Sequence, residues 1–433
     1  MPETKKLKNG LRTIMIPFAG TEAVTFLVMI KVGSRYETPE LNGASHFIEH
    51  MMFKGTKKRP TTLHISKELD AVGASYNAFT GKGYTGYYAK VPAEHFSLAV
   101  DLLHDMIFNS VYAPKEMAKE RKVIIEEIKM YEENPMMHID DLLEEKLLSG
   151  NTLGWNIAGD AKTMTKMKRS EVIKFRDKFY VPSRFVIAAA GKLPVGAEKL
   201  IAEKFGKPLT PTLSRREGDK SGFDFIPFKH VGCSCCWPKA AVQFKEIEQV
   251  QLAFGFISPG SREEKKDLVA DILATILGGT MSSRLFISVR EKKGLAYFVR
   301  ASHSSYEEVG VFSIRAGLDK NKVSAASKVI FSEFRDIKKK GVSAKELKLA
   351  KDYIKGKLKL AFEDSSARAD FYANQELLND KIETPEVLIK RVDKITAKDI
   401  QKLAQEILSE DRMTVAAVGP FKTEKDLMKA VGL

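Results

Sequence analysis

Cysteine is nearly absent from this sequence of 433 residues, and long apolar runs are absent altogether. Its three cysteines, Cys233, Cys235 and Cys236, are so close together that they cannot form the disulfide framework of a small secreted protein. No apolar run reaches the roughly 18 residues that a transmembrane helix needs, and the N-terminal residues lack the apolar core of a signal peptide. We therefore expect a cytoplasmic protein without a membrane-spanning segment.

The few cysteines follow a histidine, His230, which gives the pattern H-x2-C-x-C-C. Such a cluster could bind a metal ion. A closed site would need a ligand from elsewhere, because the chain has no second cysteine pair. Free thiols are the favoured interpretation, and a metal site here is the weaker alternative.

Acidic residues are fewer than basic ones, and the formal net charge is +14 at pH 7. A basic chain can bind nucleic acid or an anionic surface. Here Lys and Arg are spread along the chain among Glu and Asp, and no nucleic-acid-binding motif occurs. We expect a dispersed, solvated basic surface and no nucleic-acid or membrane partner. A basic cleft for acidic peptides is the alternative.

What the sequence does contain is an internal repeat, in a chain long enough for two or three domains. The apolar run TFLVMIKVGSR ends at Arg35, and a similar run, VQLAFGFISPGSR, ends at Arg262. A helix-like segment and an apolar strand close at Gly191, and a similar pair closes at Gly419. The offset between copies is nearly the same for both landmarks, which indicates two copies of one domain. The predicted segments are an N-terminal domain (1–205), an interdomain linker (206–247) and a C-terminal domain (248–433).

Each copy mixes strand-like and helix-like segments without the regular alternation of a parallel α/β protein. Residues 84–91 and 310–318 alternate as strands do, whereas residues 114–134 and 343–364 have helical spacing. This favours an α+β fold in which each of two homologous domains is an antiparallel β-sheet with helices packed on it. Two such domains on a long linker can face each other and enclose a space.

Residues 46–50 read His-Phe-Ile-Glu-His. On a helix, His46 and His50 lie one turn apart on one face, so both can direct an imidazole nitrogen at one metal ion. Glu49 precedes the second histidine, which gives H-x-x-E-H, the inverse of the H-E-x-x-H motif. Catalytic zinc usually has three protein ligands, so another element must supply a third. Two histidines on an amphipathic helix also occur by chance, and the motif alone leaves that alternative open.

A third ligand can come from the helix predicted over residues 114–134. Glu120 and Glu127 are seven residues apart there and share one face. The apolar neighbours expected on that side are Val123, Ile124 and Ile128. A carboxylate among apolar side chains needs a partner, because burying a lone charge is unfavourable. A solvated helical carboxylate is the alternative for either Glu.

Together these segments resemble the pitrilysin and mitochondrial processing peptidase family of zinc metallopeptidases, the inverzincins. The family pattern is H-x-x-E-H-x76-E, and His50 and Glu127 stand at this spacing. The family places another Glu seven residues earlier, where Glu120 stands. The resemblance implies that His46, His50 and Glu127 bind Zn2+. It also implies that Glu49 is the general base and that Glu120 supports a histidine ligand. It covers nearly the whole chain and implies the two-domain clamshell of a short, bacterial-type processing peptidase.

The second half of the chain has no counterpart of the metal motif. The family has an Arg and a Tyr seven residues apart in this half, and Arg290 and Tyr297 match them. By resemblance, Tyr297 hydrogen-bonds the substrate carbonyl and Arg290 holds the substrate backbone; without it, they are a surface Arg and a packing Tyr. Residues 73–88 resemble the family's edge strand, in which Asn77 and Ala78 present backbone to the substrate. An ordinary hairpin strand is compatible with the same residues.

By this resemblance the chain is a zinc metalloendopeptidase that hydrolyses internal bonds of unfolded peptides or small proteins in a chamber between two domains. Zinc lowers the pKa of a water molecule and polarises the scissile carbonyl, while Glu49 accepts the water proton. The alternative is a non-catalytic scaffold or partner subunit of a processing-peptidase-like complex. Some family members divide the zinc motif and the Arg and Tyr between two chains. Because this chain carries both sets, we expect a homodimer or a self-sufficient chain that binds a peptide substrate.

Overall fold

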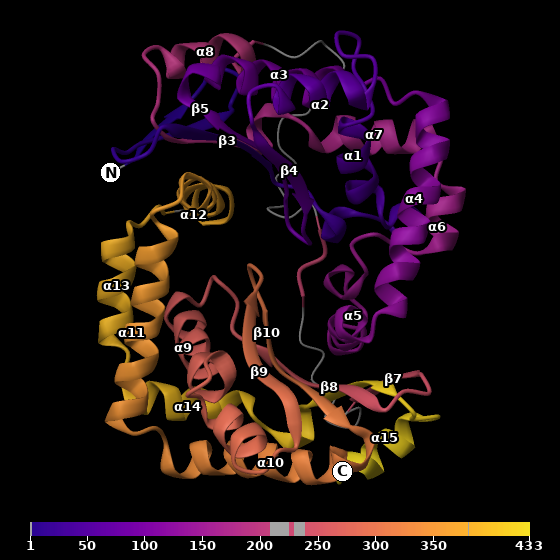
Figure 1. The fold of residues 1–433 in the computed structure, drawn as a ribbon, viewed down its shortest axis with the longest axis vertical. Coiled ribbons are helices and arrows are strands. Elements are labelled where there is room, and N and C mark those ends of the chain that lie inside the picture. The colour runs from indigo at the N-terminus through magenta and orange to yellow at the C-terminus, as the bar shows by residue number, and fades with distance from the viewer. Residues whose placement is uncertain (1, 208–224, 229–238, 380) are drawn as a thin grey trace. The chain divides into compact units, whose positions relative to one another are not determined.

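The chain, in a computed structural model that describes residues 2–207, 225–228, 239–379 and 381–433, folds into two compact units. The first unit holds residues 1–128, 155–226 and 358–384, and the second holds 129–154, 227–357 and 385–433. Each unit is built around one sheet (Figure 1). Most of the predicted linker lies outside the described residues, and so does the whole cluster of His230, Cys233, Cys235 and Cys236.

The sheet of the first unit has six strands in the order β1-β2-β6-β3-β5-β4. Their bounds are Glu3–Lys6 (β1), Arg12–Pro17 (β2), Ala23–Ile30 (β3), Ser75–Thr80 (β4), Thr85–Pro92 (β5) and Phe185–Gly191 (β6). β2 and β6 run parallel, and the other neighbours are antiparallel. The central strands β3 and β6 are buried almost throughout, because helices cover both faces of the sheet. In the described part of the chain β4 pairs with β5 alone, so it is an edge strand.

The sheet of the second unit has five strands in the order β7-β11-β8-β10-β9. Their bounds are Lys239–Phe244 (β7), Gln249–Ser258 (β8), Ala296–Ser305 (β9), Gly310–Asp319 (β10) and Thr414–Gly419 (β11). This order repeats β2-β6-β3-β5-β4 strand for strand, so the two homologous α+β domains predicted from the sequence are confirmed. Each sheet also has one parallel pair that the sequence analysis did not predict, β2–β6 and β7–β11. It arises because β6 inserts beside β2, and β11 beside β7, and each runs in the direction of that neighbour.

Helices of the first half of the chain cover one face of the first sheet. Their bounds are Ala44–Met52 (α1), Thr62–Asp70 (α2), Phe96–Asn109 (α3), Pro114–Glu133 (α4), Ala161–Lys166 (α6), Arg169–Phe179 (α7) and Ala197–Phe205 (α8). The core on this face joins Phe26 of β3 to Phe47 of α1, Phe96 of α3 and Phe179 of α7, all of them buried. Helix α1 is therefore held between the sheet and its neighbouring helices on its apolar side.

The second unit has a corresponding set of helices. Their bounds are Pro135–Leu147 (α5), Glu264–Ala274 (α9), Val323–Lys340 (α10), Ala344–Ala361 (α11), Pro385–Lys394 (α13), Ala397–Ile407 (α14) and Glu424–Val431 (α15). Its main core includes Phe254 and Phe256 of β8 packed against Phe331 and Phe334 of α10. Among the described residues, no helix is long and apolar enough to cross a membrane.

Each sheet takes the helix on its other face from the opposite half of the sequence. Helix α12 (Ser365–Leu378) packs on β3 and β6 of the first sheet through Ala369, Tyr372 and Ala373. Helix α5 packs on β8 and β11 of the second sheet through Ile139 and Leu143. Each compact unit therefore includes one helix from the other half of the sequence. The domains predicted from the repeat were continuous segments and did not include these helices.

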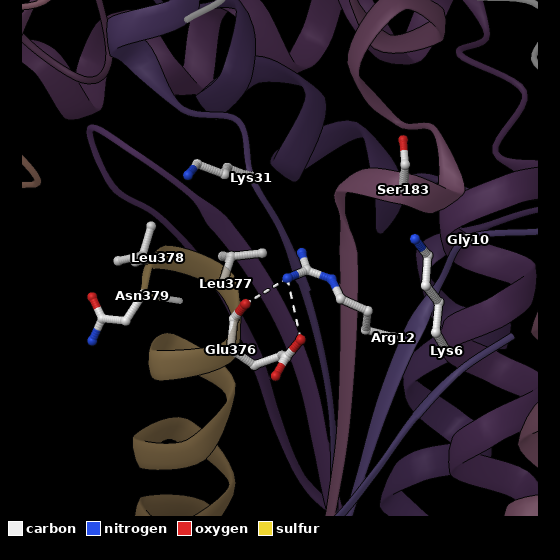
Figure 2. A pocket seen from close by; sticks show the side chains of 9 residues that line it. All are labelled: Lys6, Gly10, Arg12, Lys31, Ser183, Glu376, Leu377, Leu378 and Asn379. Atoms are coloured by element: carbon white, nitrogen blue, oxygen red, sulfur yellow. Dashed lines mark hydrogen bonds and ion pairs between the residues drawn. The ribbon is translucent and has the colours of Figure 1, made fainter. Parts of the chain in front are cut away.

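A cavity of about 390 Å³ lies where the C-terminal end of α12 meets the first sheet (Figure 2). Nine residues line it: Lys6, Gly10, Arg12, Lys31, Ser183, Glu376, Leu377, Leu378 and Asn379. Arg12 donates hydrogen bonds to the backbone oxygen (2.5 Å) and to Oε1 (3.3 Å) of Glu376. The Arg12 guanidinium is therefore already paired with Glu376. These hydrogen bonds attach the end of α12 to the sheet beside the cavity.

Candidate metal centre

Helix α1 carries three of the predicted site residues, and a buried carboxylate fixes its start. The helix begins after Gly43, whose φ of +97° lies in the left-handed region that favours glycine. Glu37, 5% exposed, accepts hydrogen bonds from the backbone N–H groups of Gly43 (2.8 Å) and Ser45 (2.7 Å). These donors have no partner within the helix, so the carboxylate satisfies them. Burial raises the pKa of Glu37 to about 7, although the hydrogen bonds act against it.

His46 and His50 lie one turn apart on α1 and bring their Nε2 atoms within 3.1 Å of each other. The ring centroids are 4.5 Å apart, with the rings edge to face. The buried residues that anchor the other side of the helix are Phe47, Ile48, Met51 and Met52. The histidines therefore share one face, which is what their spacing predicts.

Glu127 approaches the histidines from α4. Its Oε2 lies 3.6 Å from Nε2 of His50 and 3.9 Å from Nε2 of His46. Within the described ranges, these three side chains form the one group of His, Cys, Asp or Glu residues placed to hold a metal ion. The second unit presents no such group among its described residues.

The donor atoms fit a zinc ion in protonation and spacing. Nδ1 of His50 lies 2.8 Å from Oε1 of Glu120, so it carries the ring proton and Nε2 presents a lone pair. Burial, with the neighbouring His50 as the next cause, lowers the pKa of His46 to about 3, so this ring is neutral at pH 7. Neutral imidazole and ionised carboxylate are the forms that bind metal. A tetrahedral zinc ion with bonds of about 2 Å separates its ligand atoms by about 3.3 Å, close to the observed distances.

Glu120 is the carboxylate behind His50. It is 5% exposed, and its Oε2 lies 2.6 Å from Nζ of Lys54. Burial acts to raise the pKa of Glu120, but the hydrogen bonds from His50 and Lys54 outweigh it and lower the pKa. The carboxylate therefore stays ionised and holds the His50 ring in one orientation. Of the apolar neighbours expected near it, Ile124 is buried, whereas Val123 is 51% exposed and does not belong to that side.

We expect Glu120→Gln to lower zinc affinity by about 10- to 100-fold, because the partner of a ligating histidine fixes its tautomer and orientation. Competition with a coloured chelator measures the affinity. Glu116→Gln is the matched control, since Glu116 lies one turn earlier on α4 and pairs with Lys119 at the surface. Equal affinities for the Glu120 variant and the wild type would show that His50 needs no carboxylate partner.

Glu49 lies beside the ligand cluster on α1 and is held from β4. Oγ1 of Thr80 donates a hydrogen bond to its Oε2. Burial raises the pKa of Glu49 and the negative charge of Glu127 adds to the rise, while Thr80 and His50 act in the opposite direction. A carboxylate whose pKa is raised toward the working pH suits a group that must both accept and return a proton.

Three side chains that hold this site were missed by the sequence analysis: Glu37, Lys54 and Thr80. Lys54 lies two residues beyond α1, and Glu37 lies seven residues before it. Both residues lie outside the helix, so no helical or strand periodicity relates them to the H-x-x-E-H motif. Thr80 lies within the segment predicted as an edge strand, and its alternation with Ala78 was the only available signal.

The predicted substrate strand is β4, and the structure places it at the edge of the first sheet. Asn77 is exposed and Ala78 is half-buried. Oδ1 of Asn77 accepts a hydrogen bond from the backbone N–H of Ala78 at 2.9 Å. Among the described strands β4 pairs with β5 alone, and the Asn77 side chain occupies the Ala78 N–H, so the role of these residues in substrate binding stays a prediction.

The structure places Arg290 and Tyr297 in the second unit. Arg290 lies on the π-helical turn Phe286–Glu291, with its guanidinium carbon 4.8 Å from the centroid of the Phe286 ring. Tyr297 lies on β9 and is 43% exposed, with its ring beside Gly317 of β10, so the alternative of a sheet-packing aromatic stays open. Because both belong to the unit without the metal cluster, their approach to it stays a prediction.

Comparison with known proteins gives matches in both halves of the chain. A family model described as Insulinase (Peptidase family M16) matches residues 13–161, which include the metal cluster. A second, described as Peptidase M16 inactive domain, matches residues 166–354. The division between the two models agrees with a metal cluster in the first copy of the repeat.

Curated relatives match over nearly their whole length. An uncharacterized zinc protease of Bacillus subtilis is 35% identical over 414 residues, 95% of this chain and 97% of that protein. An uncharacterized zinc protease of Rickettsia felis is 34% identical over 424 residues, 96% of this chain and 97% of the relative. The crystal structure of a protease from Helicobacter pylori matches with a TM-score of 0.87 at 22% identity, over 97% of this chain and 99% of that one. This last match shows the fold.

Proposed function

Because the chain belongs to peptidase family M16, we propose that it is a zinc-dependent endopeptidase that hydrolyses internal bonds of unfolded peptides or small proteins. The observation that carries the proposal is the cluster of His46, His50 and Glu127, with the carboxylate of Glu49 on the helix of the two histidines. A bound zinc ion supplies a Lewis acid that lowers the pKa of a water molecule and polarises the scissile carbonyl.

Glu49 performs the proton transfers in this proposal. Its carboxylate accepts the proton of the attacking water and returns it to the nitrogen of the leaving amine. Its partial burial and raised pKa support both steps, because a group with an ordinary carboxyl pKa holds a proton too weakly near neutral pH. Glu120 keeps the His50 ring fixed while this happens, since it accepts the hydrogen bond from Nδ1.

The edge strand β4 explains why the substrate should be an unfolded chain. An extended peptide can add to a free sheet edge through main-chain hydrogen bonds, which tolerate many side chains. We propose that Asn77 and Ala78 provide this contact. In the second unit, we propose that Tyr297 donates a hydrogen bond to the substrate carbonyl and that Arg290 holds the substrate backbone.

Removal of metal tests the proposal with the purified chain. We expect wild-type protein to contain zinc and to cleave an internally quenched peptide, to lose this activity with 1,10-phenanthroline, and to regain it with added zinc. Glu127→Gln should lose most of its zinc and its activity, because one ligand loses its charge. Glu126→Gln, an exposed neighbour on the same helix, should match wild type. Activity that survives complete metal removal would contradict the proposal.

The same experiment distinguishes the zinc-dependent endopeptidase from the non-catalytic alternative. A scaffold or partner subunit would bind peptides without cleaving them, with or without zinc. The presence of both the metal cluster and the Arg290–Tyr297 pair on one chain favours a homodimer or a self-sufficient chain. Cleavage by the isolated chain would therefore exclude an obligatory partner of another sequence.

A further inference from the structure

We infer that Thr80 is a positioning residue that sets the orientation of the Glu49 carboxylate from the end of the edge strand. The inference rests on the proposed function and adds a residue to it. The contact that carries it is the hydrogen bond from Oγ1 of Thr80 to Oε2 of Glu49. This hydrogen bond to Oε2 restrains the rotation of the Glu49 carboxylate. The other oxygen, Oε1, is then the atom that exchanges protons with the reactants.

The alternation of side chains along β4 points Thr80 at α1. Successive residues of a strand face opposite sides of the sheet. Tyr76 and Ala78 pack against the core on the side of α1, so Thr80, two residues further on, faces the same side. Phe79 faces the other side, where it packs edge-on to Tyr84 with centroids 6.1 Å apart. The strand therefore cannot present Thr80 elsewhere without moving Phe79 out of its core.

The neighbour of Phe79 across the sheet fixes that ring further. Gly86 lies opposite Phe79 in the register of β4 and β5. A Cβ atom at Gly86 would come within 2.2 Å of the Phe79 ring, so the ring lies directly on the glycine backbone. The position of Thr80 thus depends on close packing on both faces of β4.

The turn that follows Thr80 is tied to the segment that leads into α1. The backbone N–H groups of Ser34 and Arg35 donate to the carbonyl oxygens of Gly81 (3.3 Å) and Lys82 (3.0 Å). At Gly33 a Cβ atom would lie 2.1 Å from the oxygen of Gly81, so the two backbones are in close contact. Two residues after Arg35, Glu37 binds the first N–H groups of α1. One short segment thus fixes both the donor strand and the helix that carries Glu49.

This arrangement gives the edge strand a second role. In the proposed function β4 binds the substrate backbone, and its last residue holds the catalytic carboxylate. Alignment of the substrate and alignment of Glu49 therefore depend on the same strand. The hydroxyl of Thr80 acts on the chemical step, because it contacts Glu49 and none of the three metal ligands in the described interactions.

Steady-state kinetics of Thr80→Val and Thr80→Ser test the inference. Val has the shape of Thr without the hydroxyl, and Ser keeps the hydroxyl. We expect Thr80→Val to lower kcat about tenfold, the effect of roughly one hydrogen bond, with KM and zinc content unchanged. Thr80→Ser should recover most of the lost kcat. Thr13→Val is the matched control, because Thr13 is a buried threonine of β2 in the same sheet and its hydroxyl contacts a backbone oxygen. Its kcat should equal that of wild type.

Each other outcome overturns the inference in a recognisable way. An unchanged kcat in Thr80→Val, with an active wild type, refutes the role of Thr80 and leaves the proposed function intact. Equal losses in the Val and Ser variants, with a lowered unfolding midpoint or lost zinc, indicate a purely structural role and also refute it. A wild-type protein without zinc-dependent cleavage refutes the proposed function, and the inference with it.

Discussion

Glu49→Gln is expected to lower kcat by about 10²- to 10⁴-fold, the usual contribution of a general acid–base group. The substitution keeps the size of the side chain and leaves an oxygen that can accept the hydrogen bond from Thr80. It removes the ability to take a proton from water. Single-turnover cleavage of an internally quenched peptide measures the effect on the chemical step directly.

Zinc content separates this result from loss of the metal site. Glu49 is not among the three clustered ligand atoms, so the variant should bind zinc as wild type does. Peptide binding should also persist, because the edge strand is unchanged. A Glu49→Gln enzyme that retains more than about a tenth of the wild-type kcat would show that the proton acceptor is another group.

The shape of the metal centre was predictable where it depends on helical periodicity. His46 and His50 are four residues apart, and the helix turns them onto one face whatever surrounds it. The presence of two similar domains followed from the repeat, since similar segments fold alike, whereas the order of their strands was not predicted. The gap between His50 and Glu127 needed the family resemblance, because no local rule brings α4 to α1.

Residues that hold the site from outside the helix were not predictable in this way. Glu37 meets the start of α1 through a loop, and Thr80 meets Glu49 across the gap between a strand and a helix. Such contacts depend on the path of the backbone in three dimensions, which spacing along one element does not encode. The exchanged helices α5 and α12 were missed for a related reason. Their apolar faces indicate burial but do not identify the sheet on which they pack.

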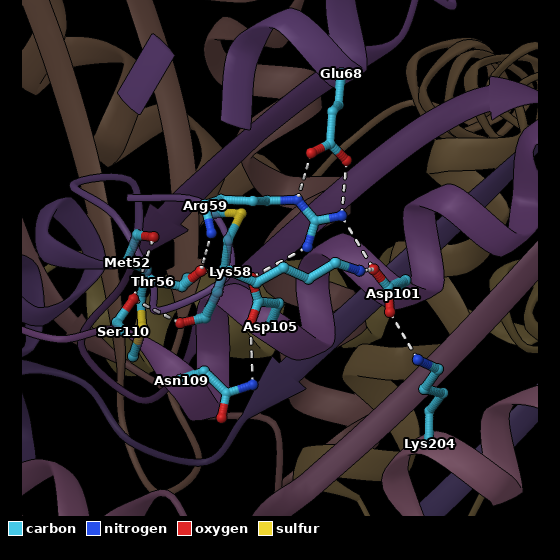
Figure 3. Close-up of polar contacts among 11 residues, drawn as sticks. Met52, Thr56, Lys58, Arg59, Glu68, Asp101, Asp105, Asn109, Ser110 and Lys204 are labelled. Atoms are coloured by element: carbon cyan, nitrogen blue, oxygen red, sulfur yellow. Dashed lines mark hydrogen bonds and ion pairs between the residues drawn. The ribbon is translucent and has the colours of Figure 1, made fainter. Parts of the chain in front are cut away.

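A network of ion pairs around the buried Arg59 supports α1 from its C-terminal side (Figure 3). Arg59, whose side chain is 3% exposed, donates to Asp105 (3.1 Å), Asp101 (3.0 Å) and Glu68 (2.7 Å). Its backbone N–H donates to Oγ1 of Thr56, which in turn donates to Oδ2 of Asp105. The loop that follows α1 is thereby joined to α2 and α3. Lys58 and Lys204 also pair with Asp101, so three cations balance three carboxylates.

Arg59→Met is expected to lower the free energy of unfolding of the first unit by about 3–5 kcal/mol, because it leaves the buried carboxylate of Asp105 without its cation. Hydrogen exchange of α1, α2 and α3 measures this without requiring both units to unfold together. Lys192→Met is the control. Lys192 forms an exposed pair with Glu22 in the same unit, so its loss should leave exchange unchanged. Similar effects of the two substitutions would show that the buried ion pairs of Arg59 stabilise the unit no more than an exposed ion pair does.

The loss of stability at acidic pH gives a second test of the ion pairs around Arg59. Burial opposes ionisation of Asp101, but hydrogen bonds from Lys204, Lys58 and Arg59 outweigh it and hold its pKa below the usual value of 3.8. A carboxyl group with a lowered pKa in the folded state stabilises the protein above its unfolded pKa, and this stability is lost as the pH falls through the folded value. Wild type should therefore lose stability below about pH 4 more steeply than Arg59→Met, in which Asp101 has lost one of its three cations.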